Sequence, residues 1–215
     1  MCHCQVKGRL RGSGEAYIGR VEFTELLKRR RMVHHFDSRP IPREILDSIL
    51  ESALHAPSAG FSQGLALIVL DDPDQVAWFW RTTQGAMPDD RPPVIVMPIP
   101  DKRVYLERYS RDDKGGPHGP RAVESGWPVP HFWDTDAAMA CMLMLLKAVD
   151  EGVGGWFFGI PQGQDELLET LGVPAGLRPV GVLGLGYRAH GERMEGSSVT
   201  IPRRSLGDVV HRGRW

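Results

Sequence analysis

Residues 137–146 form the stretch that most constrains how this chain can fold. They are alanine, methionine, cysteine and leucine without a charged side chain, which favours a helix that has almost no polar face. Such a helix is buried on all sides, so it is either the central helix of a core or a helix that packs against a second subunit. Asp134 or Asp136 can cap its start, and Gly152 can end it.

Short apolar strands and helices alternate over most of the remaining chain. Phe23, Leu26 and Leu27 recur at helical spacing, so the arginine run at residues 29–31 is expected at the end of a short helix. A second helix opens at Arg43, after two prolines. This order favours the α+β class, with a sheet flanked by helices in three layers. The later elements are expected to be strands at residues 65–70, 94–97, 154–158 and 180–187, and helices around residues 76–80 and 165–171.

The length of 215 residues suits one compact domain, which we expect to span residues 21–215. Residues 1–20 are rich in glycine and arginine without periodicity, so they are expected to be a flexible arm. Residues 101–133 form the longest irregular stretch, and their aromatic side chains argue against disorder. Within it, residues 127–133 are either a lid over a substrate or core between elements. The tail after Gly191 has no core pattern of its own until its last residues.

The charge of the chain is balanced, with 26 Lys and Arg against 27 Asp and Glu and a formal net charge of -1. No global basic field is present, so a nucleic-acid module built on the arginine run is disfavoured, and any anion site must be local. No apolar run reaches the roughly 18 residues of a membrane span, and no leader peptide precedes a cleavage site. These features favour a cytoplasmic protein without a membrane partner.

The three cysteines do not form a disulfide framework. Cys2, His3 and Cys4 could be half of a zinc site, but no companion pair is spaced to complete it, so a disordered tail is favoured. The neighbours His34 and His35 would point apart on a helix and are not expected to bind one metal ion. We therefore predict no metal site.

Two arginine pairs, Arg30-Arg31 and Arg203-Arg204, stand near opposite ends of the expected domain. Arginine grips oxyanions through a planar fork of donors and stays charged at any relevant pH, so the two pairs favour one shared phosphate ligand. The alternative for the first pair is a solvated helix end that the helix dipole favours.

Several motifs follow one another in order along the chain. The first is Arg30-Arg31-Met32-Val33-His34-His35-Phe36, followed by Pro40-Ile41-Pro42 and by Ala56-Pro57-Ser58-Ala59-Gly60-Phe61-Ser62-Gln63. Later come Gly152-Val153-Gly154-Gly155-Trp156-Phe157, Gly186-Tyr187 and Arg203-Arg204. In order and spacing these motifs resemble the nitroreductase-like family of flavin mononucleotide (FMN) enzymes, and the resemblance spans residues 23–210.

The resemblance implies a three-layer fold with a central mixed sheet flanked by helices and an extended C-terminal tail. It also implies a homodimer with FMN at the interface, and hydride transfer from NADH or NADPH to a small electron-poor acceptor such as a nitroaromatic, a quinone or an enone. The arginine pairs would hold the FMN phosphate, and the turn at residues 57–63 would line the ring. No side chain is expected to be a catalytic acid or base. By position, the cofactor-binding residues are Arg30, Arg31, Met32, His34, Pro57, Ser58, Ala59, Gly60, Ser62, Gln63, Gly154, Gly155, Arg203 and Arg204.

Several positions depart from the family pattern. Met32 replaces the usual hydroxyl side chain, and His34 stands where an arginine or lysine commonly meets the pyrimidine edge of the ring. Phe61 occupies the usual asparagine position, and Gly64-Leu65 replaces Pro-Trp. The Gly-Phe-x-Gln turn is similar instead to the flavin-cleaving branch that makes dimethylbenzimidazole, although that branch carries an acidic residue at the position of Met32.

These departures leave two further functions open. One is a protein that stores or senses flavin or deazaflavin without turnover. The other is a flavin-cleaving enzyme similar to the benzimidazole synthases.

Overall fold

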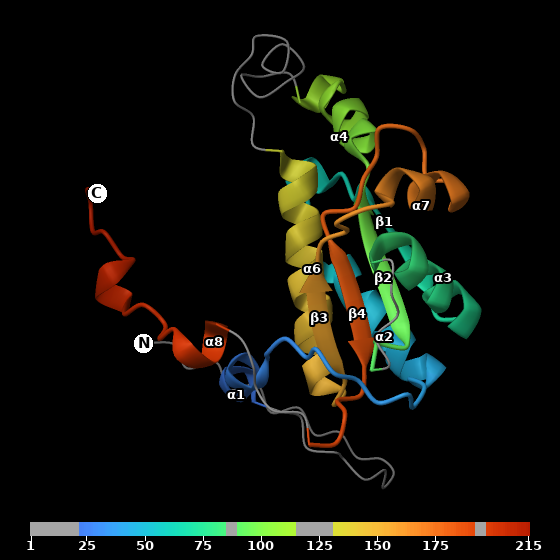
Figure 1. Cartoon of the computed structure of the whole chain (residues 1–215). Coiled ribbons are helices and arrows are strands. Elements are labelled where there is room, and N and C mark those ends of the chain that lie inside the picture. Colours follow the sequence, from blue (N-terminus) through green and yellow to red (C-terminus); the bar gives the residue numbers. More distant parts are fainter. Residues whose placement is uncertain (1–21, 85–89, 115–130, 192–196) are drawn as a thin grey trace, which may run out of the picture.

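The structure is a computed structural model that describes residues 22–84, 90–114, 131–191 and 197–215 (Figure 1). The predicted N-terminal arm and its Cys2-His3-Cys4 motif lie outside these residues. The predicted α+β class and three-layer arrangement are confirmed.

The centre of the fold is a four-stranded sheet with the order β1-β2-β4-β3. Each strand lies antiparallel to its neighbour, which differs from the mixed sheet that we expected. Among the described residues, parallel pairing is confined to an isolated bridge between Met32 and Gly155. After β1 the chain comes back beside it in the opposite direction, so the two strands are antiparallel. Antiparallel neighbours, unlike parallel ones, need no crossover connection across the sheet. The strands are β1 (Leu65–Leu70), β2 (Val94–Pro100), β3 (Gly154–Phe158) and β4 (Val182–Gly186).

Helices cover both faces of the sheet, with α6 on one side and α3 and α7 on the other (Figure 1). The first core joins α2 (Arg43–Ser52) and α6 (Phe132–Asp150) to the sheet through buried residues such as Ile49, Met144 and Leu183. The second core joins α3 (Pro73–Gln84) and α7 (Gln164–Thr170) to the other face through residues such as Phe79, Trp80 and Leu167. Most of the fold's stability comes from removing these apolar side chains from water.

Two predicted boundaries need correction. Helix α6 begins at Phe132 with His131 as its N-cap, so neither Asp134 nor Asp136 caps it. Phe132 and Trp133 extend the helix backwards, which places both aspartates inside it. The stretch expected to be irregular contains α4 (Lys102–Tyr109), which Asp101 caps by accepting a hydrogen bond from the backbone N–H of Arg103.

Helix α4 was missed because it buries only Tyr105 and therefore has no apolar stripe for a sequence pattern to show. A single 3-10 turn, η3 (Asp112–Lys114), follows it. Residues 115–130, including Trp127, lie outside the described part of the chain.

Helix α6 is not buried on all sides within one chain. It buries Ala140, Cys141 and Met144 against the sheet, but Met139 and Met142 are 40% and 45% exposed. The helix therefore packs on the core of its own chain, and its exposed methionines leave packing against a second subunit, the other predicted role, as a prediction. Burial raises the pKa of the Cys141 thiol to about 12, because the low-dielectric surroundings disfavour the thiolate.

The chain ends in an exposed tail that contains α8 (Ser197–Thr200) and the 3-10 turn η4 (Leu206–Asp208). Its last part extends away from the body of the domain (Figure 1). Every described side chain from Val199 to the end is exposed, including the apolar Val199, Ile201, Leu206, Val209, Val210 and Trp215. The predicted extended tail is therefore present, and its apolar side chains lack cover within one chain.

None of the helices in the described ranges is long and apolar enough to cross a membrane.

Candidate flavin site

The turn at residues 57–63 has a strained backbone. Gly60, Phe61 and Gln63 have φ values of 63°, 53° and 56°, in the left-handed region. A Phe or Gln residue with this backbone conformation is destabilised by about 1 kcal/mol or more, and strained residues of this kind are common at ligand sites. The turn is closed by its own hydrogen bonds, in which Ser62 Oγ donates to Ala59 O at 2.6 Å and Gln63 N donates to Ser58 Oγ at 3.0 Å.

Helix α6 holds this turn through the carboxylate of Asp136, which is only 7% exposed. The backbone N–H of Ala59 donates to Asp136 Oδ2 at 2.7 Å, and the hydroxyl of Tyr105 donates to the same oxygen at 2.9 Å. One buried carboxylate thus joins α6, α4 and the turn. Burial, with the hydrogen bond to Asp136, raises the pKa of Tyr105, so its hydroxyl stays protonated and remains a donor.

Helix α4 contacts the turn a second time through Arg108, whose Nε donates to Gly60 O at 2.9 Å. The ring of Tyr109 covers Gly60 so closely that a Cβ there would lie 3.2 Å from it. Consecutive residues of the turn, Ala59 and Gly60, are therefore fixed from two different helices.

The segment at residues 30–34 lies beside β3. The backbone N–H of Val33 donates to Gly155 O at 3.0 Å, next to the Met32–Gly155 bridge. A Cβ on Gly154 would come within 2.9 Å of Val33 Cγ2, and a Cβ on Gly155 within 2.6 Å of Leu145 Cδ2. The two glycines therefore allow the segment and the core to approach β3, which is a packing role beside the predicted role at the flavin ring.

The side chains of Met32 and His34 both contact residues of β3. The sulfur of Met32 accepts a hydrogen bond from Phe157 N at 3.4 Å, and the side chain packs against the first core. The exposed His34 ring meets Trp156 edge to face, with 5.2 Å between the ring centroids.

Arg30 follows α1 (Phe23–Arg29) as its C-cap, so the predicted helix before the arginine run is present. Its Nη1 atom is buried and has no hydrogen-bond partner in the part of the chain that the structure describes. Arg31 beside it is half-buried. A buried guanidinium nitrogen without a partner is costly, so this atom calls for an anionic ligand.

The turn 57–63 and the segment 30–34 lie at opposite ends of the domain. Leu65, two residues after the turn, pairs with Pro100 at one end of the sheet, whereas Gly155 lies level with Leu185 and Val94 at the other. Helix α6 spans the gap: Asp136 is near its start, and its last residue is Asp150, about 20 Å further along the axis at 1.5 Å per residue. Figure 1 shows α4 and the start of α6 at one end and α1 at the other.

The second arginine pair lies in the exposed tail. Arg203 and Arg204 are exposed, and Arg204 Nη2 donates to the backbone carbonyl of Asp208 within the tail. The tail turn itself is closed by a capping box between Ser205 and Asp208. The contacts of Arg204 and of this turn therefore lie within the tail itself.

The three side chains that fix the turn, Asp136, Tyr105 and Arg108, were absent from the predicted site. The available signal was a carboxylate at position 136, directly before a run of apolar residues. A lone aspartate there has either a cap role or a buried partner, and only the fold distinguishes them. The described residues contain no cluster of His, Cys, Asp and Glu that could hold a metal ion.

Comparison with known proteins gives a consistent result. The sequence profile of the Nitroreductase family matches residues 27–110. A protein of Archaeoglobus fulgidus, provisionally named NADH dehydrogenase/NAD(P)H nitroreductase, is 26% identical over 198 residues, which is 90% of this chain and 99% of that protein. A protein of Methanothermobacter thermautotrophicus with the same name is 24% identical over 177 residues, covering 80% and 81% of the two chains.

Solved structures share the fold. A protein of Exiguobacterium sibiricum, provisionally named a nitroreductase and solved in complex with FMN, superposes with a TM-score of 0.64 at 20% identity, over 89% of this chain and 97% of that one.

We expect Asp136→Ala to lower the free energy of unfolding by about 2–3 kcal/mol, because the buried Tyr105 hydroxyl and the half-buried Ala59 N–H lose a charged acceptor. Tyr105→Phe removes one of these bonds and is expected to cost about 1–2 kcal/mol. Urea unfolding of each variant measures both values. Asp134→Ala is the matched control, since this half-buried aspartate lies on the same helix but does not contact the turn. Equal losses in the Asp134 and Asp136 variants would contradict the role given to Asp136.

Proposed function

Because the chain belongs to the nitroreductase family, we propose that it is an FMN-dependent oxidoreductase that transfers hydride from NADH or NADPH to a small electron-poor acceptor such as a nitroaromatic, a quinone or an enone. The FMN-bound relative from Exiguobacterium sibiricum and the names of the two archaeal relatives support the cofactor and the reductant.

The single observation that carries this proposal is the buried Nη1 of Arg30, which has no hydrogen-bond partner among the residues that the structure describes. The phosphate of FMN carries nearly two negative charges near neutral pH and would supply the missing acceptor. A charge-assisted bond between arginine and phosphate is roughly twice as strong as a neutral one. Arg31 beside it, and Arg203 and Arg204 from a tail, would complete the phosphate clamp.

When bound, FMN would accept a hydride from the nicotinamide and deliver two electrons to the acceptor. For a quinone, NAD(P)H, one proton and the quinone give NAD(P)+ and the quinol. The protein's part is to bind and orient. Turn 57–63 would line the ring with backbone groups that Asp136 and Arg108 hold in place, and His34 would meet its pyrimidine edge. No side chain of this chain is assigned a proton transfer.

The distance between the two parts of the site supports a homodimer with FMN at the interface. The turn 57–63 and Arg30 lie toward opposite ends of the sheet, so within one chain a single FMN would have to extend along much of α6 to reach both. In a two-fold dimer, the segment 30–34 of one chain would meet the turn of its partner, and each dimer would contain two such sites. The exposed Met139 and Met142 on α6 and the apolar tail are the surfaces that such a dimer would cover.

We also propose a cytoplasmic location. Cys141 is a free thiol, buried in α6. An unpaired thiol in the core is compatible with a reducing compartment.

A storage or sensor protein for flavin is the second candidate, and Met32 favours it. Its sulfur is engaged by Phe157 N, so Met32 gives the ring no polar contact at a position where the family usually has a hydroxyl. Both functions need the same phosphate clamp, and they differ in turnover.

We expect the purified protein to be yellow, to bleach without oxygen when NADH or NADPH is added, and to recover its colour when a quinone follows. Absorbance in the flavin band measures all three steps. A yellow protein that never bleaches favours storage or sensing over turnover. A colourless protein that does not bind added FMN contradicts both.

The interface site can be tested by mixing two inactive variants. Arg30→Ala removes the phosphate partner, and Pro57→Trp places bulk on the exposed side of the turn, so neither homodimer is expected to retain FMN. After equal amounts are unfolded and refolded together, random pairing gives one intact site per mixed dimer, or about a quarter of all sites. Bound FMN per chain is the measurement.

Pro174→Trp is the matched control for Pro57→Trp, because Pro174 is also an exposed turn proline but lies outside the proposed site. If the mixture retains no more FMN than the separate variants, the site lies within one chain and the interface proposal fails.

A further inference from the structure

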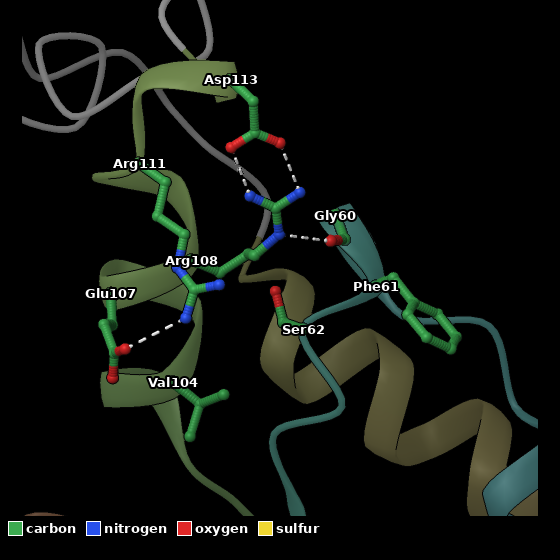
Figure 2. A pocket seen from close by; sticks show the side chains of 8 residues that line it. All are labelled: Gly60, Phe61, Ser62, Val104, Glu107, Arg108, Arg111 and Asp113. Carbon is green, nitrogen blue, oxygen red and sulfur yellow. Dashed lines mark hydrogen bonds and ion pairs between the residues drawn. The ribbon is translucent and has the colours of Figure 1, made fainter.

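A groove of about 390 Å³ separates α4 from the turn that would line the flavin ring (Figure 2). The turn contributes Gly60 and Ser62 to one wall, and α4 with the residues after it contributes Val104, Glu107 and Arg111 to the other. The volume is within the usual range for a small-molecule site. The groove also carries more charge than an apolar stacking pocket would need.

Two charged side chains of the groove, Arg108 and Asp113, already bind each other. Arg108 donates to both carboxylate oxygens of Asp113, at 2.9 Å and 2.8 Å, and its Nε donates to Gly60 O (Figure 2). The bidentate contact with Arg108 lowers the pKa of the Asp113 carboxyl, so this carboxylate stays charged near neutral pH. The three guanidinium nitrogens of Arg108 are all hydrogen-bonded already. Arg108 is therefore a positioning residue that offers little free charge to a ligand in the groove.

Arg111 is held far more loosely. Among the described residues, its side chain has one hydrogen-bond partner, Glu107, through a single contact of 3.2 Å between Arg111 Nη2 and Glu107 Oε1. The two side chains are 61% and 72% exposed, and an exposed pair of this kind contributes between about 0 and 1 kcal/mol. A guanidinium has five N–H donors, so most of the fork of Arg111 remains available to a ligand.

We propose that this groove selects acceptors that carry a carboxylate or a similar anionic group, which Arg111 binds while the electron-poor part of the acceptor lies over the turn. A planar ligand carboxylate can take two parallel N–H bonds from the fork, which the single contact with Glu107 does not provide. The Val104 side chain faces the same groove and offers apolar cover for the body of the ligand (Figure 2). This inference rests on the proposed oxidoreductase function and specifies its substrate class.

The test is a charge series of similar nitroaromatic acceptors, namely 4-nitrobenzoate, the neutral 4-nitrobenzamide and the cationic 4-nitrobenzylammonium, with the FMN-loaded protein. We expect kcat/KM to be highest for 4-nitrobenzoate. In Arg111→Gln the advantage of the anion over the amide is expected to fall about tenfold, mainly through KM, because the lost interaction is made on binding. Arg111→Lys keeps the charge and should retain part of the preference.

Arg103→Gln is the matched control. Arg103 lies on α4, a few residues before Arg111, and pairs with Asp101, yet it does not line the groove, so its loss should leave the preference unchanged. Added salt should weaken the preference of the wild-type protein, since the Arg111 side chain is exposed.

The inference is overturned if the wild-type protein treats the three acceptors alike, if it prefers the cation through Glu107, or if Arg111→Gln keeps the full preference for the anion. In each of these results the acceptors are still reduced and the proposed function stands. A protein that binds FMN but reduces none of them, nor a quinone, overturns the proposed function instead.

Discussion

The carboxylate of Asp136 is the interaction on which the candidate site depends. It lies in the first part of α6, almost fully buried, and accepts from the backbone of the turn and from Tyr105 of α4. A turn with three left-handed residues would relax if its hydrogen bonds were free to exchange with water. The buried carboxylate therefore holds the strained turn in one conformation, because breaking its hydrogen bonds would leave a buried charge without partners.

The length of helix α6 also determines how the two parts of the candidate site are placed. The helix connects the end of the domain that holds the turn with the end that holds Arg30 and Gly155, and Leu145, which lies against Gly155, is about 14 Å along its axis from Asp136. Its outward face is apolar at Met139 and Met142. The same helix therefore keeps the two halves of the proposed site apart in one chain and offers the surface through which a second chain would join them.

Sequence patterns predicted the strands, the helix after Arg43 and the apolar helix well, because each has a clear apolar period or a proline or glycine at its end. They missed α4, which buries only Tyr105, and they gave Asp136 the role of a cap. A pattern shows which residue types recur but not which partner a buried carboxylate finds. For the same reason, the motifs around Arg30 and Pro57 were taken as one site, and only the register of the sheet shows that they occupy opposite ends.

The departures from the family pattern also acquire physical reasons. Met32 fills space beside β3 and accepts from Phe157 N, which a small hydroxyl side chain would not do in the same way. Phe61 is 76% exposed at the apex of the turn, where its backbone is left-handed, so its ring is presented outwards and contributes little to the core. Under the proposed function, both residues bear on what the flavin ring would meet.

Sedimentation velocity, followed in the flavin band and in the protein band of the same sample, tests the central claim most directly. A flavin site shared between two chains predicts that flavin absorbance sediments only with the dimer at every protein concentration, and that a monomer fraction obtained by dilution is colourless. Flavin that sediments with the monomer at full occupancy would contradict it.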